Sequence, residues 1–154
     1  TITGTIITKY EDAFAAIPLL VSFIPMLMDT GGNCGSQSAT LIIRGIALGE
    51  IQFKDIFRVI FKEFRVSLIV SVVLALANGV RILIMYKDMA LALVIGLSLI
   101  GTVIISKLIG CVLPLFAKKV HLDPAIMASP LITTLVDTCS ILIYFNIATM
   151  LFNL

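Results

Sequence analysis

A cluster of polar side chains lies inside an otherwise apolar stretch of the chain between Pro25 and Glu50. In hydrocarbon each unsatisfied polar group costs several kcal/mol, so these groups must face protein, water or an ion. Asp29, Asn33 and Gln37 are spaced four residues apart and would project from one face of a continuous helix. All three offer oxygen atoms, which hard cations such as Mg²⁺ prefer. Hydrogen bonding between packed helices is the alternative interpretation of the cluster. Its members are Asp29, Thr30, Asn33, Ser36, Gln37, Ser38 and Thr40.

A single carboxylate, that of Asp137, stands inside the last apolar segment. Asp137 follows Asp123 by about 14 residues, or about 21 Å of helix, which predicts a position near the middle of the membrane. Carboxylates at that depth are costly and usually functional. Thr133 and Thr134, one turn earlier, add hydroxyl groups. A homodimer with its twofold axis along a pore would bring two Asp137 carboxylates together, and their repulsion would favour a divalent cation between them. A hydrogen bond from Asp137 to a neighbouring helix is the alternative.

The composition is that of an integral membrane protein. Of the 154 residues, 60% are hydrophobic and 13% are charged, and the mean hydropathy is +1.15. Soluble domains carry about 45–50% apolar and about 25% charged residues. The net charge of +2 is small and the basic residues lie at segment ends, which excludes a nucleic-acid-binding surface. We expect one transmembrane domain over residues 1–154 with no room for a soluble domain, and a chain that is a fragment, because it opens like the tail of a helix.

The pattern predicts an all-α bundle of four full transmembrane helices, preceded by the end of another helix. Pro18, Pro25 and the pair Gly31-Gly32 predict that the first full span is kinked or partly unwound beside the polar cluster. Asp123 and Pro124 predict the cap and first turn of the last span. The four spans are expected at about residues 13–43, 66–85, 89–116 and 124–152.

The connector from Arg44 to Arg65 alternates apolar and charged residues with helical periodicity, which predicts an amphipathic helix on the membrane surface. The positive-inside rule places the more basic side of the chain in the cytoplasm, so the C-terminus of this plasma-membrane protein is expected outside. Seven basic residues lie on the cytoplasmic side, namely Arg44, Lys54, Arg58, Lys62, Arg65, Lys118 and Lys119, and three lie on the other, namely Lys9, Arg81 and Lys87.

Two further charged residues have less specific interpretations. Lys107 is expected to extend toward the cytoplasmic headgroups, and an ion pair with an intramembrane aspartate is the alternative. Glu63 is expected on the solvated face of the connector. The odd number and the spacing of Cys34, Cys111 and Cys139 favour buried thiols over disulfides or a zinc site.

Two motifs resemble the signature of the MgtE family of magnesium channels. The first runs from Met28 to Glu50 and contains Asp-Thr-Gly-Gly-Asn-Cys-Gly-Ser-Gln-Ser. The second runs from Leu122 to Asp137 and is followed by Leu-Ile-Tyr-Phe over residues 142–145. The resemblance covers nearly the whole chain and is that of a transmembrane domain alone.

The resemblance implies a homodimer in the lipid bilayer with a pore on its twofold axis, lined by the second and fifth helices of each protomer. On this chain those helices carry Asp29 to Thr40 and Asp137, respectively. Asp137 would be the acidic residue in the middle of the pore, and Thr133 would contribute to the filter. The transported ion would be hydrated Mg²⁺, with Mn²⁺ or Co²⁺ passing to some degree. Paired cytoplasmic CBS modules, outside this chain, would close the pore.

Three rivals to a divalent-cation channel remain open at this stage, and one of them is a membrane subunit that only anchors a soluble part. An intramembrane aspartyl hydrolase could use Asp29 and Asp137 as a pair of carboxylates that share a proton, but the sequence lacks the Tyr-Asp and Gly-x-Gly-Asp pairs of such proteases, so we do not expect an enzyme. A Mg²⁺ exchanger that is coupled to another cation would use the same polar residues as a channel.

Overall fold

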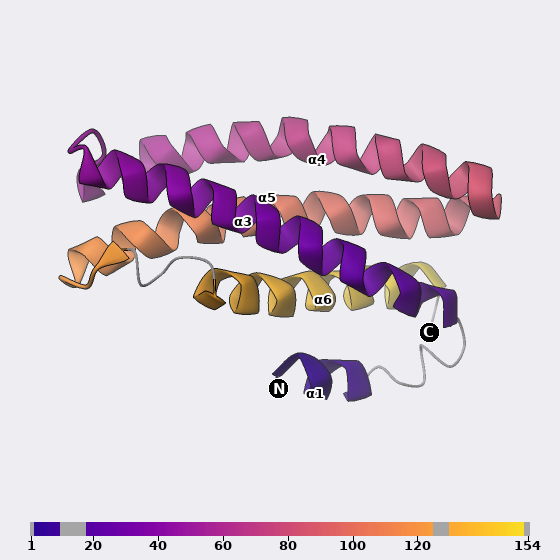
Figure 1. Ribbon diagram of the computed structural model, residues 1–154. Coiled ribbons are helices and arrows are strands. Elements are labelled where there is room, and N and C mark those ends of the chain that lie inside the picture. The colour runs from indigo at the N-terminus through magenta and orange to yellow at the C-terminus, as the bar shows by residue number, and fades with distance from the viewer. Residues whose placement is uncertain (1, 10–17, 125–129, 153–154) are drawn as a thin grey trace.

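The computed structural model describes residues 2–9, 18–124 and 130–152 (Figure 1). These residues form helices, and within the range 18–124 the helices are joined by short turns. Three of the helical stretches, 53–86, 89–119 and 130–152, are long and apolar enough to cross a membrane. The prediction of an all-α membrane protein is therefore confirmed. The elements in chain order are α1 (Ile2–Lys9), the 3-10 helix η1 (Pro18–Phe23), α3 (Ile24–Ala47), the 3-10 helix η2 (Phe53–Asp55), α4 (Ile56–Tyr86), α5 (Met89–Lys119) and α6 (Pro130–Phe152).

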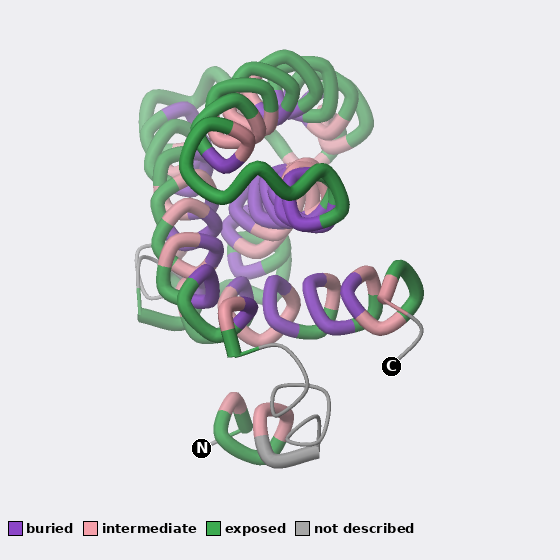
Figure 2. Tube along the Cα trace, turned by 90° about the vertical axis from the view of Figure 1, so that its right-hand side faces the viewer, coloured by how far each residue is buried: buried purple, intermediate pink, exposed green. Residues whose placement is uncertain are grey.

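Helix α5 is the centre of the bundle, and α3, α4 and α6 pack around it (Figure 1). Leu99 and Val103 of α5 are both 0% exposed, and the same helix also buries polar side chains such as that of Lys107. Helix α4 packs mainly on α5 and leaves most of its surface uncovered (Figure 2). Helices α3, α5 and α6 all pack on one another, so α6 is held by α3 and by α5 directly.

Helix α3 is continuous through Gly31 and Gly32, so the expected unwinding beside the polar cluster does not occur. Pro25 lies in the first turn of α3 and Pro18 is the first residue of η1. Proline is tolerated at those positions because the first turn has no hydrogen-bond acceptor for its missing N–H. The two prolines therefore begin helices and do not break one.

The connector also differs from the expected surface helix over residues 44–65. Helix α3 runs on to Ala47, Gly49 turns the chain at a φ of 73°, and α4 then continues from Ile56 to Tyr86 as one helix. Before that helix, the Asp55 carboxylate accepts a hydrogen bond from the Gln52 N–H at 3.0 Å and caps η2, from which α4 continues directly. The amphipathic segment is thus the beginning of a membrane-spanning helix.

Helix α6 begins at Pro130, part-way along the bundle and not level with the end of α5 (Figure 1). The predicted first turn after Pro124 falls on residues 125–129, which lie outside the described residues. Near the other end of α6, the buried Tyr144 hydroxyl donates a hydrogen bond to the Leu20 carbonyl oxygen at 2.8 Å. This bond attaches η1 to α6 and fixes the direction from which α3 enters the bundle.

Candidate metal site on α3 and α6

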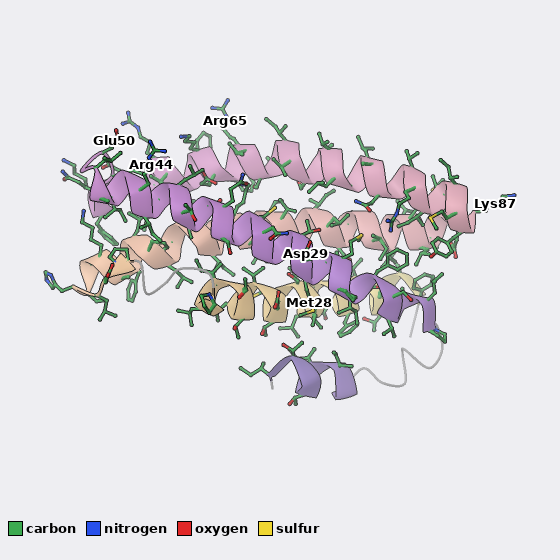
Figure 3. All side chains as sticks on the ribbon, viewed as in Figure 1. Met28, Asp29, Arg44, Glu50, Arg65 and Lys87 are labelled. Atoms are coloured by element: carbon green, nitrogen blue, oxygen red, sulfur yellow. The ribbon has the colours of Figure 1, made fainter. Side chains whose placement is uncertain are left out.

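Two carboxylates predicted from the sequence lie around one cavity between α3 and α6. The cavity has a volume of about 170 Å³, and Asp29 from α3 lies near the middle of the bundle length (Figure 3). Because α6 starts part-way along the bundle, its second turn brings Asp137 to the same level. We call this space the acidic cavity; its lining residues are Met28, Asp29, Gly32, Asn33, Thr133 and Asp137.

Glycines on α3 allow the close approach of the helices that form the acidic cavity. A Cβ atom on Gly32 would lie 3.3 Å from Thr133 Cγ2, and one on Gly31 would lie 2.8 Å from Val136 Cγ1. Gly35 is similarly tight against Ile132, at 3.0 Å. Small residues at helix contacts are the usual means of close packing in membranes. The glycines of the first motif therefore serve packing, and they bring the α3 polar groups to the α6 carboxylate.

The α6 hydroxyls beside the cavity are oriented by the backbone of the first turn of that helix. Thr133 Oγ1 donates to the Pro130 carbonyl oxygen at 3.1 Å, and Thr134 Oγ1 donates to the same oxygen at 2.8 Å. Since each hydroxyl hydrogen is used in its bond to Pro130, the hydroxyl oxygen can take part in further hydrogen bonds only as an acceptor. Thr133 can therefore accept hydrogen bonds from water bound to a cation.

Gln37 and Thr134, also predicted as ligands, do not line the acidic cavity. Both side chains are exposed. Gln37 lies one turn beyond Asn33 on the same face of α3, and Thr134 lies next to Thr133 on α6. Together with the cavity residues they form what we call the polar stripe, a continuous band on the outside of the protomer. Its members are Asp29, Asn33, Gln37, Thr133, Thr134 and Asp137.

One protomer does not supply a complete metal cage. In the described parts of the chain, no group of three or more His, Cys, Asp or Glu side chains lies close enough together to hold a metal ion. The acidic cavity brings only two carboxylates, Asp29 and Asp137, together with amide and hydroxyl oxygens. This donor set suits a hard cation that keeps most of its water, and a closed all-protein site is not formed.

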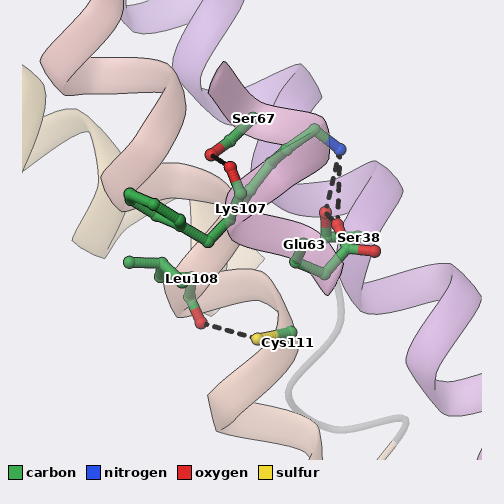
Figure 4. A network of polar contacts seen from close by, with 7 residues as sticks. Ser38, Glu63, Ser67, Lys107, Leu108 and Cys111 are labelled. Carbon is green, nitrogen blue, oxygen red and sulfur yellow. Dashed lines mark hydrogen bonds and ion pairs between the residues drawn. The ribbon is translucent and has the colours of Figure 1, made fainter. Parts of the chain in front are cut away.

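Behind the polar stripe, a buried polar network joins α3, α4 and α5 (Figure 4). Lys107 Nζ lies 3.5 Å from Glu63 Oε2, and the two residues are 3% and 6% exposed. Ser38 Oγ donates to Glu63 Oε2 at 2.8 Å and accepts from Lys107 Nζ at 3.1 Å. Lys107 therefore does not extend to the headgroups and Glu63 is not solvated, so both expectations are corrected.

The sequence reasoning missed this network, although a signal for it was present. Val59, Glu63, Ser67 and Ser71 recur at intervals of four, and all of them are buried on the face of α4 that meets the bundle. A glutamate within a series of small, buried residues is not in the environment of a solvated residue. All three cysteines are free thiols, but the expectation that they are buried holds only for Cys111, because Cys34 and Cys139 are half-buried.

The fold and the acidic cavity define a multi-pass α-helical membrane protein with a carboxylate-bearing polar stripe on its surface. The chain belongs to the MgtE family: the family model, described as a divalent cation transporter, matches residues 24–147. This is a family of transporters and not of enzymes, as the sequence predicted.

Three proteins that are each named magnesium transporter MgtE are similar to this chain. The protein of Bacillus subtilis is 40% identical over 148 residues, or 96% of this chain. That of Thermus thermophilus is 36% identical over 152 residues, or 97% of this chain. That of Enterococcus faecalis is 32% identical over 148 residues, or 96% of this chain. The match covers 33% of each relative, so the chain spans about a third of their length.

Proposed function

We propose that this chain forms the Mg²⁺-conducting pore of a homodimer, with α3 and α6 of each protomer on the twofold axis. The observation that carries the proposal is the polar stripe itself. Asp29, Asn33 and Gln37 are exposed on the outside of a bundle that spans a membrane. Lipid cannot satisfy these groups, whereas a second copy of the same stripe would enclose them around water.

In this dimer the two Asp137 carboxylates face each other and hold a hydrated divalent cation between them. Mutual repulsion of the carboxylates is relieved by the ion, and Mg²⁺ retains most of its water because it dehydrates reluctantly. Asp29, Asn33 and Thr133 accept hydrogen bonds from that water, since they line the same cavity as Asp137. Gln37 and Thr134 accept hydrogen bonds from the water of the hydrated ion at the next position along the polar stripe. Mn²⁺ and Co²⁺ have similar oxygen chemistry and pass to a smaller degree.

The ion enters from outside and leaves into the cytoplasm. The basic ends of α3, α4 and α5 face the cytoplasm of a cell whose plasma membrane holds the protein, and the C-terminus lies outside. A doubly charged ion gains about 4.6 kcal/mol per 100 mV of membrane potential on entry, which drives uptake without a coupled ion. The similar relatives are about three times longer, and a cytoplasmic CBS-type regulator in the remainder of such a protein would close the pore.

The test is Mg²⁺ flux into liposomes that contain the purified chain, with and without the substitution Asp137→Asn. The amide preserves size and removes the charge, so we expect flux to fall to the level of empty liposomes. Asn146→Ala is the matched control: Asn146 is an exposed polar residue on α6, about half a helical revolution away from Asp137, and it does not line the acidic cavity. Wild-type flux in Asp137→Asn would refute the role of the carboxylate. Flux that requires a Na⁺ or H⁺ gradient would refute the channel and indicate an exchanger.

A further inference from the structure

One surface of α4 combines three basic side chains with an apolar band. An open groove of about 340 Å³ lies between side chains that all belong to α4, and no acidic residue lines it. In the part of the chain that the structure describes, none of its three basic side chains forms an ion pair. The Arg65 guanidinium carbon lies 6.0 Å from the centroid of the Phe61 ring. We call this space the basic cavity; its lining residues are Arg58, Phe61, Lys62, Arg65, Val66 and Ile69.

The apolar band continues from the basic cavity toward the other end of α4. Ile69, Val73 and Leu76 are spaced by four and three residues and so share the helix face of Arg58 and Arg65. Their side chains are 69%, 61% and 65% exposed, because α4 packs mainly on α5 and nothing in the described part of the protomer covers this face. We call these three residues the apolar lane.

We propose that the basic cavity and the apolar lane together bind a glycerophospholipid with an anionic headgroup. The phosphate and headgroup charge lie among Arg58, Lys62 and Arg65, whose guanidinium and ammonium groups donate hydrogen bonds to phosphate oxygens. One acyl chain lies along the lane. Eleven residues separate Arg65 from Leu76, which is about 16 Å of helix. One leaflet of a bilayer has a hydrocarbon thickness of about 15 Å, so headgroup and chain fit the two parts of the surface at once.

The lane distinguishes a lipid from an acidic protein segment as the occupant. A soluble acidic segment could meet the three positive charges, but it would have no contact with side chains that continue into the hydrocarbon. The basic residues also stand in the first turns of a membrane-spanning helix, where the surface of an anionic leaflet attracts positive charge. The three basic side chains and the apolar lane therefore both favour an anionic lipid over an acidic protein segment.

The experiment measures unfolding of the purified chain in a neutral detergent while phosphatidylglycerol or phosphatidylcholine is added. We expect phosphatidylglycerol to raise the unfolding midpoint of the wild-type chain and phosphatidylcholine to have little effect. Each basic residue near an anionic surface contributes about fivefold in affinity, so the half-saturating phosphatidylglycerol concentration should rise by about a hundredfold in the variant R58Q/K62Q/R65Q. The single variant Arg58→Gln, which removes one of the three charges, should show a rise of about fivefold.

The matched control is K54Q/K118Q/K119Q, which removes the same charge from the same end of the bundle but from residues outside the basic cavity. In this control, phosphatidylglycerol should raise the unfolding midpoint by as much as it does in the wild-type chain, measured from the control's own midpoint without lipid. An equal loss in the control would reduce the effect to general surface charge and overturn the site. An unchanged response to phosphatidylglycerol in R58Q/K62Q/R65Q would also overturn the lipid site. An equal response of the wild-type chain to both lipids would overturn it too, and would favour an acidic protein segment as the partner of the three basic residues.

Discussion

The contact between α3 and α5 provides the sharpest test of how the bundle is held together. A Cβ atom on Gly110 would collide with the carbonyl oxygen of Gly35 and would lie 3.0 Å from its carbonyl carbon and 3.2 Å from its Cα. All three atoms belong to the backbone, so no side chain can rotate out of the way. Gly110→Ala must therefore push the two helices apart.

The expected loss of stability follows from that geometry. Overpacking a tight contact costs about 1–3 kcal/mol. For a chain of this size this loss lowers the unfolding midpoint by roughly 2 to 12 °C. Gly79 provides the matched control, because a Cβ there would meet no atom within 4 Å. Gly79→Ala makes the same chemical change in a helix and should be neutral or stabilising by about 0.5–1 kcal/mol, since alanine is the better helix former.

The assay is thermal unfolding in detergent with a dye that fluoresces when it reacts with thiols. Cys111 is a free thiol that is 0% exposed, so its reaction with the dye reports the opening of the bundle, whereas the half-buried Cys34 and Cys139 contribute a background reaction. Gly35 also lies between Asn33 and Gln37 on α3, so Gly110→Ala should lower Mg²⁺ flux at temperatures where the protein is still folded. Equal midpoints for Gly110→Ala and Gly79→Ala would show that α3 and α5 do not touch at this point, and the close packing described here would be refuted.

Three further predictions test the network, the attachment of η1 and the dimer. Glu63→Ala leaves the Lys107 ammonium buried without its carboxylate partner and should lower the free energy of unfolding by about 3–5 kcal/mol. The double variant E63L/K107M should unfold near the wild-type midpoint, and equal losses of stability in both variants would contradict a paired role. Tyr144→Phe leaves the Leu20 carbonyl without its donor and should cost about 1–3 kcal/mol by thermal unfolding, and no loss would mean that water replaces the hydroxyl. In a chain whose native cysteines are replaced by alanine, Gln37→Cys should form disulfide-linked dimers on oxidation in membranes. Monomers alone would contradict a twofold axis that brings the two α3 helices together.

The hydrophobic pattern was sufficient to predict an all-α membrane protein, because long apolar segments have few alternatives in a membrane. It also singled out Asp29 and Asn33 by their spacing on one helix face and Asp137 by its depth, but it did not place the three residues at one level of the bundle. The structure shows them around one cavity. What brings them together is the glycine contact between α3 and α6, and pairing of helices is not encoded in the periodicity of either one.

The failures have a different physical origin. Pro25 was interpreted as a break because an isolated sequence does not show where the helix begins, and in the first turn the same residue is favourable. Glu63 was assigned to solvent because its partner, Lys107, is 44 residues away in the sequence and on another helix. Long-range charge pairs of this kind become visible only after the helices have been packed.

The Glu63–Lys107 pair has a consequence for how the chain enters the bilayer during synthesis. A single charged residue within a span opposes insertion by about 2.5–3.5 kcal/mol at the centre of the helix. Helices α4 and α5 are separated only by Lys87 and Asp88, so they can enter the membrane as a hairpin. In a hairpin the glutamate of the first helix neutralises the lysine of the second before α6 has been made. We expect the translocation machinery to release these two helices together, as the first lipid-embedded unit of the bundle.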